Sequence, residues 1–165
     1  MAGGRLVLVA LIVTAAVPAG AFALGGIAKL DDPLLAAQFI GHVLSVRLDH
    51  AFDLTRAIAV CELVLAAGIC LSLGRRRWPA YSGMCLLAFF IGMLLVVQLR
   101  DPQAASCGCF GGLMGRLFLR SLWTQIGIDL GLMVSLAMHL VLSYAQSAGS
   151  SGPGGIDNAS SAAPD

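Results

Sequence analysis

The stretch AYSGMCLLAFFIGMLLVVQL, residues 80–99, decides the fold because it contains no charged residue. About 20 residues, each rising 1.5 Å along a helix, cross a hydrocarbon core of roughly 30 Å. Backbone N–H and C=O groups find no water in lipid and must bond within the segment, which favours an α-helix. The stretch therefore predicts a transmembrane helix.

Three more runs of the same kind occupy residues 6–28, 54–74 and 117–144. Apolar residues make up 58% of the 165-residue chain and charged residues 12%, whereas about a quarter of a soluble domain is charged. The sequence therefore predicts an all-α membrane protein, a four-transmembrane-helix bundle forming one domain over residues 1–144. Residues 145–165 have few large apolar side chains, so we expect a disordered tail.

The first run has a second interpretation, a cleavable signal peptide. Arg5 precedes a short apolar run, and Ala21-Phe22-Ala23 resembles a cleavage site. Against cleavage, the apolar character continues to residue 28, where Lys29 supplies a charged stop. Whether residues 1–23 are removed stays open, and neither outcome changes the helices that follow.

A shorter segment between the first two runs predicts an amphipathic interfacial helix that extends to about residue 48. Asp32 suits the N-cap and Pro33 the first helical position. Apolar residues recur one turn apart, and a polar stripe accompanies them. The stripe consists of Gln38, His42, Ser45 and Asp49. This segment is too polar to span and is expected to lie in the interface or to cap the bundle.

The positions of the basic residues predict the orientation in a bacterial cell membrane. Arg75–Arg77 form the tightest cluster, in the short connection between the second and third runs, and Arg5 lies on the same side. Both termini are therefore expected in the cytoplasm, and the Asp32 segment and the Cys107/Cys109 loop on the periplasmic side. Three arginines on the opposite side, Arg100, Arg116 and Arg120, weaken this signal. With a net charge of +1 and no longer basic block, the chain has no footprint for a nucleic acid.

The connection before the last run carries the sequence Cys107-Gly-Cys109-Phe-Gly-Gly. A disulfide between cysteines separated by one residue closes a very small ring, and strained disulfides exchange readily. The arginines flanking this loop would favour the reactive thiolate if they fold nearby. A redox pair is the leading interpretation of Cys107 and Cys109. A purely structural fastening and half of a metal site are the alternatives, and no His stands at the spacing that would complete a zinc site.

Two acidic residues, Glu62 and Asp129, fall inside the apolar runs. A carboxylate near the bilayer centre costs a few kcal/mol, so both are expected to face the bundle interior, at comparable depth. Gln125 lies one turn from Asp129, and Gly127 and Gly131 form a small-xxx-small pair that permits close helix contact. One hypothesis is a proton-handling or quinone-contacting pocket. The other is a polar clasp, in which an acid is protonated or bonded to Gln, Thr or Arg and fixes helix packing.

The remaining polar groups inside the runs are expected to be packing residues. Cys61, Cys70 and Cys85 should behave as small hydrophobes. His139 is expected to be packed or hydrogen-bonded.

Several of these elements occur in the order found in a known family. Residues 26–33 read GIAKLDDP and close the first run, residues 62–68 read ELVLAAG, and residues 107–111 read CGCFG ahead of residues 117–120, LFLR. Over roughly residues 5–144 the chain resembles the methylamine-utilisation MauE family, within the DoxX-like group of membrane proteins. It lacks the proline expected just before the second run, where Thr55 and Arg56 stand.

The resemblance implies a redox-associated membrane protein that supports maturation of periplasmic proteins. In the family the client is the disulfide-rich small subunit of methylamine dehydrogenase, and the partner is thioredoxin-like. Cys107 and Cys109 become the redox pair and Glu62 the family-like acid. Because similar proteins occur in bacteria without a methylamine pathway, the client stays open.

Three functions from different classes follow. The first is thiol–disulfide exchange, an oxidoreductase role, with a membrane quinone as a hypothetical electron acceptor. The second is a non-catalytic assembly factor or a subunit of an oxidase-like complex. The third is a small transporter that uses the buried acids, which the lack of inverted repeats makes least favoured.

Overall fold

The computed structural model describes residues 2–72, 77–100 and 122–149. These residues form five helices: α1 (Ala2–Asp31), α2 (Leu34–Leu44), α3 (Leu48–Ser72), α4 (Trp78–Arg100) and α6 (Leu122–Gly149). Four of them are long and apolar enough to cross a membrane, with 23 to 26 residues in each candidate span. The predicted all-α bundle of four long helices and one short helix is confirmed.

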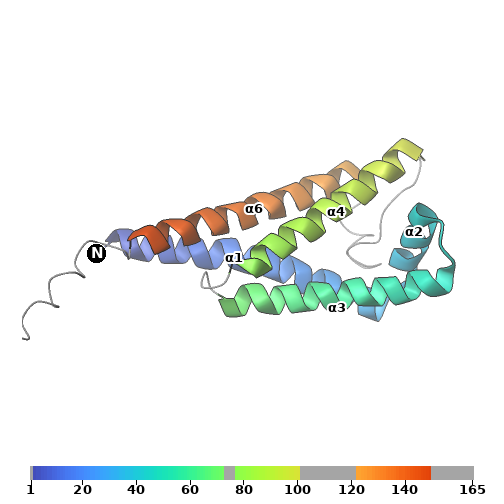
Figure 1. The fold of residues 1–165 in the computed structure, drawn as a ribbon, viewed down its shortest axis with the longest axis horizontal. Helices are drawn as coiled ribbons and strands as arrows, with labels where there is room; N and C mark the ends of the chain where they lie inside the picture. The colour runs from blue at the N-terminus through green and yellow to red at the C-terminus, as the bar shows by residue number, and fades with distance from the viewer. Residues whose placement is uncertain (1, 73–76, 101–121, 150–165) are drawn as a thin grey trace, which may run out of the picture.

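The four long helices run alternately up and down along one axis (Figure 1). α1 packs mainly against α3 and α6, and α4 packs against α6. α3 and α4 lie close where one follows the other in the chain and diverge toward their other ends, where α2 lies (Figure 1). α2 packs mainly on α3 and touches α4 only lightly. The end of the bundle that holds α2 is called the α2 end below.

The core is a stripe on each helix, and the opposite faces are apolar as well. Small residues on α1, such as Ala15 and Ala19, leave room for Phe22, Leu87 and Leu136 to fill the space between α1, α4 and α6. Large apolar side chains also cover the outside of the helices, for example Val60, Val134 and Leu99. A helix that is apolar all round suits lipid as its surroundings. The protein is a multi-pass membrane protein.

The glycines that allow close helix contact differ from those predicted. Gly127 and Gly131 are exposed, and a Cβ atom added at either would meet no described atom within 4 Å. At Gly26, by contrast, an added Cβ would lie 2.9 Å from the Ala59 carbonyl oxygen on α3. The small-xxx-small prediction on α6 is therefore wrong. Gly127 and Gly131 make no such contact because α6 is rotated so that Asp129 faces inward and both glycines face outward. The close helix crossing lies instead between α1 and α3.

The start of α2 lies one residue later than predicted. The carboxylate of Asp32 accepts the N–H of Leu34 at 3.3 Å, and the carbonyl of Pro33 accepts the N–H of Ala37 at 2.9 Å. Pro33 is therefore the N-cap residue, one position later than the predicted Asp32, and the helix begins at Leu34. α2 ends at Leu44, and its C-cap residue Ser45 has a left-handed conformation with φ 54°. α3 then begins at Leu48, a turn and a half earlier than the second apolar run suggested.

Candidate functional site

The centre of the site is an ion pair between α1 and α3. The Nζ atom of Lys29 lies 2.7 Å from Oε1 and 2.8 Å from Oε2 of Glu62. The two residues are 3% and 2% exposed, so the pair is almost fully removed from the surroundings. A buried carboxylate is tolerated only when it is paired or protonated, and here both of its oxygens accept from one ammonium group.

The local sequence explains how a lysine becomes buried at the end of a helix. Gly26 lies one turn before Lys29 and lets α1 approach α3 closely, at Ala59, one turn before Glu62. This crossing aligns the two charged residues. The lysine stem turns back along α1, so that Nζ also lies 3.5 Å from the Gly25 carbonyl oxygen. The ammonium further lies 5.5 Å from the centroid of the Phe90 ring, a cation–π contact from α4.

Asp129 on α6 belongs to the same site. It lines a partly open hollow together with Lys29, Glu62 and Phe90; the empty space there, about 300 Å³, includes space open to the outside. Asp129 is 5% exposed and lies within electrostatic range of both Lys29 and Glu62. Gln125, one turn earlier on α6, is buried as well. The prediction that Glu62 and Asp129 face the bundle interior is confirmed, and both line the same hollow.

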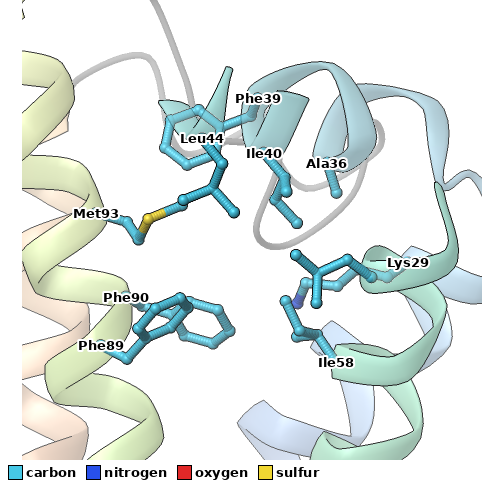
Figure 2. Close-up of a pocket in the computed structure, with 10 residues that line it drawn as sticks. Lys29, Ala36, Phe39, Ile40, Leu44, Ile58, Phe89, Phe90 and Met93 are labelled. Atoms are coloured by element: carbon cyan, nitrogen blue, oxygen red, sulfur yellow. The ribbon is translucent and has the colours of Figure 1, made fainter. Parts of the chain in front are cut away.

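A second hollow lies on the other side of Lys29, between α2, α3 and α4. It encloses about 430 Å³ of empty space, part of it open to the outside, and its lining is almost wholly apolar. Figure 2 shows Phe39 and Leu44 reaching into it from α2, Phe89 and Met93 from α4, and Ile58 from α3. Lys29 and Phe90 line both hollows and therefore form the partition between them. The larger space is called the α2 pocket below.

The predicted redox pair lies outside the described residues. Cys107 and Cys109 fall in 101–121, as do Arg116 and Arg120. The described helices on either side, α4 ending at Arg100 and α6 beginning at Leu122, both have these ends at the α2 end of the bundle (Figure 1). There the Arg100 guanidinium donates to the carbonyl of Val43, on α2, at 3.4 Å.

The other polar residues inside the spans fit the expected packing roles in part. Cys61, Cys70 and Cys85 are free thiols on the outer faces of α3 and α4, as expected for small hydrophobes. His139 is buried, but among the described residues its Nδ1 atom has no hydrogen-bond partner. It is thus a packed histidine, held within α6.

The opposite end of the bundle carries a basic and aromatic cluster. The Arg77 guanidinium lies 3.6 Å from the centroid of the Tyr144 ring, and the Tyr144 hydroxyl lies 3.2 Å from that of Tyr81. Tyrosines with an arginine at the helix ends are typical of a membrane–water interface. The cluster therefore marks the end of the bundle away from the α2 pocket.

Sequence reasoning did not identify Lys29 as a site residue. It interpreted this lysine as a charged stop and expected Gln, Thr or Arg as the partner of a buried acid, which is wrong for Glu62. A signal was present, because the chain contains a single Lys and a single Glu. In an apolar protein, a single Lys and a single Glu are candidates for an ion pair with each other, since each charge needs a partner inside the bundle.

Comparison with known proteins gives one match. The family model described as "Methylamine utilisation protein MauE" matches residues 6–146, which include all five described helices except their outermost residues. Searches for similar curated proteins and for similar solved structures gave no match. This single continuous match includes the four spans, the three buried charged residues Lys29, Glu62 and Asp129, and the Cys-Gly-Cys sequence. The chain belongs to the MauE family.

Proposed function

We propose that this membrane protein supports the maturation of extracytoplasmic proteins by thiol–disulfide exchange through Cys107 and Cys109. The observation that carries the proposal is the family match over residues 6–146, a stretch that contains the Cys-Gly-Cys pair. The family description links it to methylamine utilisation. From the resemblance given above, we take a disulfide-rich periplasmic subunit as the class of client protein and a thioredoxin-like protein as the partner.

The arrangement of the bundle supports an outward-facing pair. Arg100 and Leu122 flank the cysteine segment at the α2 end, and Arg77 lies at the opposite end with Tyr81 and Tyr144. Basic clusters in short connections favour the cytoplasmic side. The α2 end then faces the periplasm, where disulfides persist. Both termini of the span region lie in the cytoplasm in this orientation.

Turnover requires an electron acceptor. A client dithiol passes two electrons and two protons to the Cys107–Cys109 disulfide, so that the client gains an S–S bond and the pair becomes two thiols. The pair is then reoxidised by a membrane quinone, which takes up the two electrons and two protons and becomes a quinol. We assign the accompanying proton transfer to three buried ionisable groups, Lys29, Glu62 and Asp129.

Thiol labelling tests the proposal. The three other cysteines, Cys61, Cys70 and Cys85, are first replaced by Ala, which leaves the loop pair as the only thiols. A membrane-impermeant maleimide should then label sealed right-side-out vesicles only after mild reduction. The matched control, carrying Cys107→Ser and Cys109→Ser in the same background, should remain unlabelled. Labelling confined to inside-out vesicles, or equal labelling without reduction, would contradict the proposal.

A second function is favoured by the Lys29–Glu62 pair. Both oxygens of Glu62 are satisfied by a cation from another helix, which describes a packing clasp without any need for redox chemistry. A non-catalytic assembly factor would depend on this pair for its fold and would tolerate loss of both loop thiols. Accumulation of the mature client in a Cys107→Ser/Cys109→Ser strain, at the wild-type level, would favour this function over the first.

A further inference from the structure

We propose that Asp129 is the proton-binding site of the bundle and that it holds a proton as long as Glu62 neutralises Lys29. The function given above assigns proton transfer to all three groups and does not distinguish among them. The use of this proton in turnover rests on the proposed function. Its location at Asp129 follows from burial and charge and does not depend on the thiols.

The charges around the hollow that Asp129 lines do not balance. Lys29 comes from α1, Glu62 from α3 and Asp129 from α6. α4 faces the same hollow with Leu87 and Phe90 and adds no charge. One positive and two negative charges would leave a net charge of −1 inside the bundle. An uncompensated charge in such surroundings is costly, and the group that carries it neutralises instead. One of the two acids therefore holds a proton.

The contacts of the two acids decide which of them is protonated. Both oxygens of Glu62 accept from the Lys29 ammonium, at 2.7 and 2.8 Å, and such charge-assisted bonds favour the ionised carboxylate. The Asp129 carboxyl group is also buried, with the residue 5% exposed. Among the described residues, however, no ion pair or hydrogen bond joins this carboxyl group to another side chain. Asp129 is thus the acid without a counterion in contact.

The space beside Asp129 is too small to hydrate a charge. Only about 20 Å³ of the empty space there can hold the centre of a water molecule, which is room for about one water. One water molecule can relay a proton to or from the carboxyl group. It cannot replace the hydration shell that keeps a carboxylate ionised in bulk water. The hollow therefore suits a neutral acid that exchanges its proton.

Lys29 couples the two acids to each other. Asp129 lies within electrostatic range of both Lys29 and Glu62. One ammonium neutralises one carboxylate, so ionisation of the first acid disfavours ionisation of the second. If Glu62 lost its charge, Asp129 would become the anion that neutralises Lys29 and would release its proton. The cluster thus stores one proton, and the pairing of Lys29 decides where it is held.

Infrared spectroscopy of the purified protein in nanodiscs at neutral pH tests the inference. The C=O stretch of a protonated carboxyl group is separate from the bands of carboxylates and amides. One such band is expected from this cluster. It should shift when the protein is made with isotope-labelled aspartate and stay in place with isotope-labelled glutamate. The glutamate label reports on Glu62 alone, since the chain contains a single Glu.

Three variants locate the proton, each compared at wild-type helix content measured by circular dichroism. Asp129→Asn should remove the band, because an amide of nearly the same shape has no carboxyl proton. The matched control, Asp49→Asn, changes an acid whose side chain is 79% exposed and should leave the band unchanged. Glu62→Gln should also remove the band, because Asp129 then ionises to neutralise Lys29.

Four results would overturn the inference. They are the absence of a protonated carboxyl band from wild type at neutral pH, a band that shifts with labelled glutamate, and a band that persists in Asp129→Asn or in Glu62→Gln.

The experiment separates this inference from the proposed function. Protonation of Asp129 does not require the thiols, so Cys107→Ser/Cys109→Ser is expected to keep the band. The band together with failure of the labelling test would leave the proton site assigned and the thiol function refuted. Reducible outward-facing thiols without the band would leave the function standing and refute the proton site.

Discussion

Breaking the Lys29–Glu62 pair is the sharpest test of how this bundle is held together. At a separation of 2.7 Å and an effective dielectric constant of about 20, two unit charges attract by about 6 kcal/mol. Burial of both charges offsets most of this attraction. The net contribution of the pair to stability is therefore small, whereas the cost of leaving one charge without its partner is large.

Lys29→Met and Glu62→Met should each lower the free energy of unfolding by about 3–5 kcal/mol, because each strands a buried charge. The double variant Lys29→Met/Glu62→Met should differ from wild type by only about 1 kcal/mol, since methionine fills a similar volume without a charge. The two changes are thus expected to be strongly non-additive.

The free energies are measured by titrating the protein in mixed micelles with a denaturing detergent and following helix content by circular dichroism. Arg47→Ala serves as a control for charge alone, because its contact with Asp49 joins two largely exposed side chains and should contribute nothing measurable. If the double variant loses the sum of the two single effects, Lys29 and Glu62 act independently. The clasp between α1 and α3 would then be refuted.

Two further predictions use the same unfolding assay. Gly26→Ala should destabilise the protein by about 1–3 kcal/mol, because its methyl group would lie 2.9 Å from the Ala59 carbonyl, whereas Gly127→Ala should be neutral or slightly stabilising, since nothing described lies near it. Equal effects at the two glycines would contradict this close crossing. Leu136→Ala should cost about 2 kcal/mol through the cavity it leaves at a fully buried position. Val134→Ala, on the outer face of the same helix, should cost less than about 0.5 kcal/mol, and a similar loss at both positions would show that α6 is rotated differently.

The elements of the fold could be predicted from short windows of sequence. The uncharged run at 80–99 predicts α4 to within two residues at its start and one at its end. Asp32 and Pro33 predict the start of α2 to within one residue because capping involves only near neighbours in the chain. The start of α3 was harder to predict from the sequence. Residues 48–53 are too polar to read as part of a span, and they are helical because α2 packs on them, with Ala37 and Ile40 against Ala51.

The candidate site was predicted only in part. The inward orientation of Glu62 and Asp129 could be predicted because a carboxylate exposed to lipid is costly. An acidic residue inside an apolar run is visible in the sequence alone. The partner of Glu62 could not be read in the same way, because Lys29 stands at a helix end, where a lysine usually reaches toward water. Its burial depends on tertiary contacts, with Glu62 on α3 and with the Phe90 ring on α4. The prediction for Cys107 and Cys109 as the redox pair remains a prediction.

The sequence by itself determined the four spans, the short helix between the first two and the need to shelter two acids, because lipid requires every helix to satisfy its own backbone locally. Only the tertiary structure decided which faces meet. The pairing of Lys29 with Glu62, the close crossing at Gly26 and the α2 pocket all depend on how the helices are rotated and crossed. In a chain that is apolar on every face, composition does not distinguish a buried face from a lipid-facing one, so packing alone sets that rotation.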